Sequence, residues 1–212
     1  MGRLFQGFSP NNIEGLDVLE WIHKETIPAG KRVTYPRYTI DIRPEKTETH
    51  RTRITCGGNL LDYDGDTTTH TASMETIKLH WNSVLSSRGA KYATGDISNM
   101  YLMSDLPDAE YVRFRFALIP PCIVAYYHLN DFVVDGFVYA KVKKAWYGLK
   151  QAGKIAHDNL VQHLSKHGYV KAAFTDGLFF HKTRKISFTL VVDDFGIKYT
   201  KDEDLHHLET IM

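Results

Sequence analysis

The sequence predicts an α+β fold in which helices pack on one face of an antiparallel sheet. The stretch YVRFRF (111–116) alternates apolar and polar side chains, which is typical of a half-buried strand. The stretches ISFTLVV (186–192) and GIKYT (196–200) predict the two strands of a hairpin around a pair of aspartates. Residues 152–167 and 202–212 each carry one apolar face at helical spacing, as expected of helices that cover a sheet.

Local signals predict the remaining elements. Apolar residues at near-helical spacing predict a helix over 11–25, and a stretch rich in Pro, Thr, Arg and Lys predicts short strands and loops over 28–55. Ser73 is a candidate N-cap for a helix that runs through Ser87. A strand that ends near Asp96 is expected next.

The composition indicates a folded protein without a disulfide framework. Hydrophobic residues make up 43% and charged residues 24% of the 212 residues, which is typical of globular proteins. The two cysteines, Cys56 and Cys122, are far apart and in no metal-ligand spacing, which favours a reducing compartment. No apolar run reaches the length of a membrane span.

The charge is balanced over the chain but uneven along it. The formal net charge is +1, which does not by itself indicate a nucleic-acid-binding protein. The stretch KVKKAWYGLKQAGK (141–154) has five lysines and no carboxylate. Such a patch can attract phosphates, but a stretch of this kind is more often a solvated face with two anchoring aromatics, here Trp146 and Tyr147.

The adjacent carboxylates of Asp193 and Asp194 lie between the two strands of the predicted hairpin. Aspartates are common in turns, so the pair has a purely structural interpretation. Alternatively, the repulsion between two carboxylates is relieved by a cation, and oxygen ligands suit Mg²⁺ or Mn²⁺. Asp96 also ends a predicted strand, so the fold can bring three carboxylates to one sheet edge.

Three motifs resemble a known family. The stretches DISNMYL (96–102), WYGLKQAG (146–153) and LVVDDFGIKY (190–199), in this order, resemble the reverse transcriptase domain of copia-type retrotransposons. The resemblance extends from about Arg32 to the C-terminus. The chain departs from the family pattern where Val191 replaces a tyrosine and Gly153 replaces a proline.

The resemblance implies the fingers and palm of a right-hand polymerase. It divides the chain into fingers (1–91), palm (92–119), a return segment of the fingers (120–150) and palm again (151–212), with no thumb, as in a truncated copy. The implied activity is RNA-directed DNA polymerisation with Mg²⁺ or Mn²⁺, acting on an RNA or DNA template-primer and deoxynucleoside triphosphates. The implied setting is the cytoplasm, within a larger polyprotein and away from membranes. The alternative is a non-catalytic nucleic-acid-binding or structural remnant.

The resemblance also assigns roles to residues. Asp96 and Asp193 are expected to bridge two metal ions, with Asp194 and the carbonyl of Ile97 as further ligands. A nucleotide-binding set is expected at Arg51, Arg53, Tyr101, Tyr147, Gly148, Lys150 and Gln151.

Each nucleotide-binding residue also has a structural interpretation. Tyr101 is either a steric gate against the 2′-hydroxyl or a packing aromatic. Arg51 and Arg53 either hold the triphosphate or line a solvated strand edge. Residues 147–151 either line the nucleotide and template pocket or form a turn before a helix.

Overall fold

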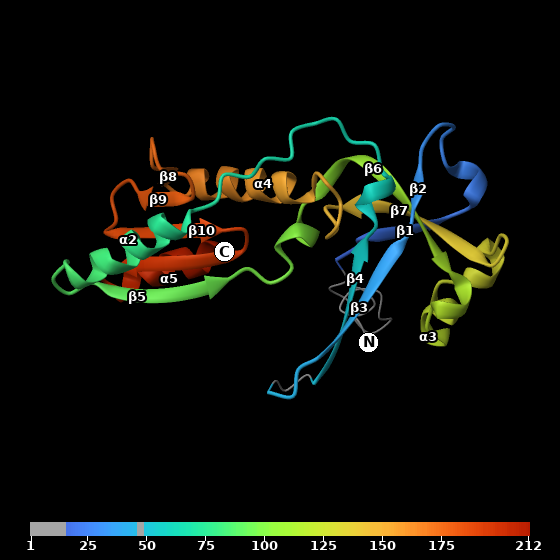
Figure 1. Ribbon diagram of the computed structural model, residues 1–212, viewed down its shortest axis with the longest axis horizontal. Helices are drawn as coiled ribbons and strands as arrows, with labels where there is room; N and C mark the ends of the chain where they lie inside the picture. The colour runs from blue at the N-terminus through green and yellow to red at the C-terminus, as the bar shows by residue number, and fades with distance from the viewer. Residues whose placement is uncertain (1–15, 46–48) are drawn as a thin grey trace. The chain divides into compact units, whose positions relative to one another are not determined.

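The computed structural model describes residues 16–45 and 49–212, which form two compact units of mixed helix and strand (Figure 1). The first unit comprises the described residues up to Thr67 together with Tyr101–Ile155, and the second comprises Thr68–Met100 and Ala156–Met212. The sheets are almost wholly antiparallel, so the α+β class is confirmed.

The first unit contains a four-stranded sheet in the order β1-β7-β6-β2. Its strands are β1 (Leu19–Ile22), β2 (Val33–Thr34), β6 (Asp105–Arg115) and β7 (Phe137–Lys144), and β2 pairs in parallel with β6. On β6, Val112 and Phe114 are fully buried, as the alternation predicts, while Phe116 lies beyond the strand. These side chains form one hydrophobic core with Trp146.

The rest of the first unit consists of a hairpin and short helical turns. The hairpin pairs β3 (Pro36–Ile42) with β4 (His50–Cys56). The short helix α3 (Pro121–Tyr126) bears the exposed Cys122, whereas Cys56 is buried. Single turns of 3₁₀ helix lie at η1 (Lys24–Thr26), η2 (Gly58–Leu60), η4 (Phe116–Leu118) and η5 (Leu129–Phe132). A further turn, η3 (Met100–Met103), crosses the boundary between the units, because Met100 belongs to the second unit and the rest to the first.

The helix predicted over 11–25 is wrong in its described part. Residues 1–15 lie outside the described residues, and Leu19–Ile22 forms β1. In this strand Leu19 pairs with Val142 and Trp21 with Ala140, so both side chains face the core of the sheet. Over only four residues the apolar pattern does not distinguish a strand from a helix, and pairing with a distant strand decides between them.

The second unit contains a five-stranded antiparallel sheet in the order β5-β11-β10-β9-β8. Its strands are β5 (Lys91–Asp96), β8 (Tyr169–Lys171), β9 (Leu178–His181), β10 (Ile186–Val191) and β11 (Asp194–Tyr199). Its helices are α2 (Met74–Leu85), α4 (Ala152–Lys166), whose first residues belong to the first unit, and α5 (Asp202–Ile211). The expected N-cap is confirmed, because the Ser73 hydroxyl accepts the Thr76 N–H at 3.2 Å.

The prediction that helices pack on a single face of the sheet is wrong for this unit. Strand pairing across β10, β9 and β8 places Ser187 and Tyr169 on opposite faces. The ring of His80 on α2 is 2.9 Å from the Ser187 hydroxyl, while that of His207 on α5 is 3.2 Å from the Tyr169 hydroxyl. We call the α2 side, with Ser187, Thr189 and Lys198, the polar face, and the α5 side, with Phe188, Leu190 and Ile197, the apolar face.

The unit boundaries differ from the divisions expected from the sequence. Residues 101–119 were expected in the palm, but β6 pairs with β7 and β2 and therefore belongs to the first unit. The assignment of the units to fingers and palm stays a prediction.

Candidate metal centre

The hairpin of β10 and β11 has a turn of only two residues. Val191 pairs with Asp194, which leaves Val192 and Asp193 as the two turn residues. Val192 has a φ of 58°, in the left-handed region that β-branched residues avoid. A positive φ at the first turn residue is typical of a type II′ turn, which matches the twist of the strands it joins. The turn thus presents Asp193 at its tip and Asp194 at the first position of β11.

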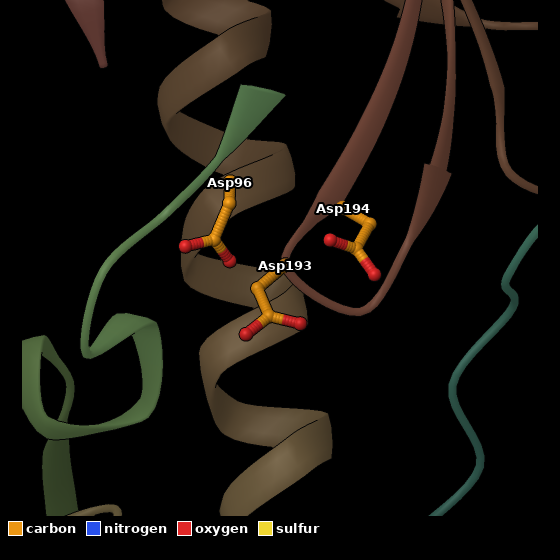
Figure 2. A group of neighbouring side chains, drawn as sticks. All are labelled: Asp96, Asp193 and Asp194. Carbon is orange, nitrogen blue, oxygen red and sulfur yellow. The ribbon is translucent and has the colours of Figure 1, made fainter. Parts of the chain in front are cut away.

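The neighbouring strand brings the third carboxylate to the same place. Asp96, the last residue of β5, lies directly opposite Asp194 in the sheet, and both are on the polar face. The N–H of Ile97 donates to the carbonyl of Asp193 at 3.1 Å, which fixes the hairpin turn against the end of β5. One oxygen from each of the three carboxylates lies within 4.8 Å of the others, and Figure 2 shows the side chains gathered at this edge.

The electrostatics of the site favour a bound cation. Partial burial raises the pKa of the Asp193 carboxyl, and the carboxylates of Asp96 and Asp194 raise it further. A cation ligated by all three groups removes this repulsion. Ligand oxygens lie about 2.0–2.6 Å from Mg²⁺ or Ca²⁺, so oxygens up to about 4–5 Å apart can share one ion. The donor set, carboxylates only, suits hard cations such as Mg²⁺ and Mn²⁺.

The strained turn gives a stability prediction. Replacing Val192 by glycine should raise the free energy of unfolding by about 1 kcal/mol, because glycine adopts a positive φ without steric cost. Thermal unfolding of both proteins measures the change. Val170 on β8 has similar exposure, 38% against 36%, and no positive φ, so Val170→Gly is a matched control that should destabilise the protein. A lower melting temperature for Val192→Gly would contradict the strain argument.

The seven residues expected to bind nucleotide all belong to the first unit. The pairing of β3 with β4 places Arg37, Arg51 and Arg53 on one face of the hairpin. Asp41 is the one carboxylate that β3 and β4 contribute to this face. The Arg53 guanidinium is 3.8 Å from the Asp41 carboxylate; the arginine is exposed and the aspartate is half-buried. The opposite face of the hairpin carries Ile40 and other apolar side chains, so the basic residues are segregated from them.

The segment 147–151 is held in place by close backbone contacts. Gly148 has a φ of 98°, and a Cβ there would lie 2.1 Å from the carbonyl oxygen of Cys56. The ring of Tyr147 stacks on that of Tyr101, with centroids 4.6 Å apart and planes 13° apart. The side chain of Lys150 is exposed. The structure thus brings together two of the expected residues, Tyr101 and Tyr147.

Gln151 is placed differently from its neighbours in this set. Its side chain is buried and donates a hydrogen bond to the Glu110 carboxylate at 3.0 Å. Burial raises the pKa of Glu110. Glu110 was missed in the sequence, although it has the same parity on its strand as Val112 and Phe114 and so belongs to the buried face. A charged residue on an otherwise apolar strand face was the available signal.

The lysine-rich stretch 141–154 is partly neutralised by other segments. Lys143 forms an ion pair with Asp17, and Lys144 forms one with Asp105 at 2.6 Å. The five lysines of the stretch therefore overstate its net positive charge, because carboxylates from other segments pair with two of them.

The sequence matches no known protein-family model, and a search of curated proteins found no match.

Proposed function

We propose that the chain is the reverse transcriptase domain of a copia-type retrotransposon, with the second unit as palm and the first as fingers. The observation that carries the proposal is the convergence of Asp96, Asp193 and Asp194 within 4.8 Å, although 193 − 96 = 97 positions separate the first two. Turn chemistry explains an Asp pair but gives no reason for a third carboxylate from another strand. The three motifs quoted above are the second support.

In this proposal Asp96 and Asp193 hold two divalent cations, Mg²⁺ or Mn²⁺, with Asp194 and the Ile97 carbonyl as further ligands. When bound, such ions activate the 3′-hydroxyl of a primer and stabilise the leaving pyrophosphate. The contribution of the chain is positional. The short turn and the Ile97–Asp193 hydrogen bond hold the carboxylates together before any ion binds, so little reorganisation accompanies binding.

The substrates in this proposal are an RNA or DNA template-primer and deoxynucleoside triphosphates. Arg51 and Arg53, which share one face of the β3–β4 hairpin, are suited to a triphosphate because guanidinium groups bind phosphate oxygens in pairs. Lys150 offers a further exposed cation. Tyr101, held flat against Tyr147, offers a rigid aromatic surface for a sugar or base. A cytoplasmic location and a larger polyprotein belong to the same proposal.

None of the helices in the described part of the chain combines the length and the apolar character that crossing a membrane requires.

Metal titration and primer extension test this function together. Asp96→Asn and Asp193→Asn should each lower Mn²⁺ affinity at least about tenfold, because each removes a charged ligand. Both should also abolish extension of a primer by deoxynucleotides. Glu209→Gln, an exposed change on α5, should alter neither. Mn²⁺ binding that survives both substitutions would rule out the metal centre. Binding that depends on them without primer extension would favour the non-catalytic remnant.

A further inference from the structure

Helix α2 packs on its own sheet mainly through polar side chains. The His80 ring meets the Ser187 hydroxyl, and the ammonium of Lys198 donates to the Ser83 carbonyl, the Ser83 hydroxyl and the Ser87 hydroxyl at 2.8–3.0 Å. His80 is the only buried residue of the helix. The half-buried Ile77 and Val84 flank this polar side. Packing of α2 on its sheet therefore does not bury the apolar side chains on the other side of the helix.

The opposite side of α2 is apolar and exposed. Met74, Trp81 and Leu85 are 59%, 60% and 84% exposed, and Lys78 is exposed between them. At about 100° per residue these four side chains fall within an arc of about 60°, roughly 130° away from His80. We call this set the α2 stripe. Leu79 is also exposed, at 70%, but it lies about 130° from the centre of the stripe on the other side.

The spacing of the α2 stripe matches the seam of a coiled coil. Successive members are four, three and four residues apart, which is the alternation of the two core positions of the heptad. A stripe with this spacing can form the contact between two paired helices. One lysine at a core position is a known device for fixing the register of such a pair.

The α2 stripe is also complementary to itself. In an antiparallel pair related by a twofold axis, residues whose numbers have the same sum lie opposite each other. Here 74 + 85 equals 78 + 81, so Met74 of one copy meets Leu85 of the other, and Lys78 meets Trp81. An ammonium over an indole ring is the most favourable cation–π arrangement. In a parallel pair, by contrast, Lys78 would lie opposite Lys78.

We propose that α2 is a self-association surface, on which a second copy of this chain docks its own α2 in antiparallel orientation. The occupant is a second copy because, in this arrangement, the one charged member of the stripe faces the indole of the other copy, so the stripe supplies its own partner. Each copy contributes four side chains, fewer than the roughly 20–30 residues that each partner brings to a standard interface, so the dimer is weak and forms at high protein concentration. The inference is independent of the metal centre and of catalysis.

Sedimentation velocity on the full chain tests the association. The wild-type protein should move from monomer to dimer between about 10 µM and 1 mM. Trp81→Ser and Leu85→Ser should each raise the dissociation constant at least about tenfold, because each removes a large apolar contact. Leu79→Ser is the matched control, since it removes an equally exposed leucine outside the stripe, and it should leave the constant unchanged. Circular dichroism verifies that each variant is folded.

Disulfide trapping tests the orientation. The exposed Cys122 is first replaced by serine. An equimolar mixture of Met74→Cys and Leu85→Cys proteins should then form a mixed disulfide dimer under mild oxidation, whereas Met74→Cys alone should form little. Three outcomes would each overturn the proposal. The wild type stays monomeric at 1 mM, Leu79→Ser weakens dimerisation as much as Trp81→Ser does, or the Met74→Cys protein cross-links to itself more readily than to the Leu85→Cys protein.

Discussion

Replacing Gly148 by alanine is expected to destabilise the first unit by more than about 3 kcal/mol. Two effects add at this position. The φ of 98° disfavours any side chain, and the new Cβ would lie 2.1 Å from the carbonyl oxygen of Cys56, which is backbone and cannot rotate away. The contact is reciprocal, because a Cβ on Gly58 would lie 2.1 Å from the carbonyl oxygen of Gly148. Segments 56–58 and 147–149 therefore approach each other closely because Gly58 and Gly148 lack side chains at the points of contact.

Gly30→Ala separates the two effects. Gly30 belongs to the same unit and has a φ of 85°, but a Cβ there meets nothing within 4 Å. It should cost only the conformational strain of a left-handed residue, about 1–2 kcal/mol. Urea unfolding followed by circular dichroism gives both values. Equal losses in the two variants would show that the contact of the new Cβ with the Cys56 carbonyl adds no cost to the strain of the positive φ.

The second large effect is a loss of stability in acid that depends on His80. Burial, and then the positive charge of Lys198, lower the pKa of this imidazole to about 4. Its Nε2 lies 2.9 Å from the Ser187 hydroxyl, and its buried Nδ1 has no hydrogen-bond partner among the described residues. A second proton would therefore occupy an unsolvated position beside an ammonium group.

The sign of the pH effect follows from this lowered pKa. The unfolded chain binds a proton at the ordinary histidine pKa of about 6.5, and the folded chain does so only near 4. His80 thus contributes no penalty above pH 6.5. As the pH falls from about 6.5 to 4, stability is lost at this residue, by less than about 3 kcal/mol because solvent screens part of the effect at this partly buried ring.

Urea unfolding of wild type and His80→Gln at pH 7, 6, 5 and 4 isolates this contribution. The wild type should lose more stability than the variant, with the gap growing towards pH 4. His181 and His207 also have lowered pKa values, through burial and nearby cations, and they act in the same direction in both proteins. His206→Gln, an exposed change on α5, should follow the wild type. A pH-independent difference between wild type and His80→Gln would contradict the argument.

The parts of the fold that sequence patterns predict well are those determined by near neighbours. The β10–β11 hairpin and the Ser73 cap depend on residues within a few positions of each other. The sequence also allowed Asp96 to lie beside Asp193 and Asp194, because all three were expected at strand ends. This arrangement requires β5 to lie beside β11, a long-range pairing that no local signal specifies.

The errors share a physical cause, which is competition from distant parts of the chain. Leu19–Ile22 becomes a strand because β7 supplies a partner about 120 residues away. Helix α2 lies on the polar face of its sheet because hydroxyl and imidazole groups of the two elements satisfy each other. The role expected of Gln151 stays a prediction; its hydrogen bond to the buried Glu110 joins two segments that are far apart in the sequence, so no local pattern specifies it.

The close packing around Cys56 also has a chemical consequence. Burial first, and the charge of Glu110 second, raise the pKa of its thiol to about 12, so almost no thiolate exists at neutral pH. The other cysteine, Cys122, is exposed on α3. Thiolates, not thiols, attack maleimide reagents, so these reagents discriminate between the exposed Cys122 and the buried Cys56. A fluorophore or spin label can thus be attached at one chosen point of the chain without any substitution, which makes the first unit accessible to spectroscopy.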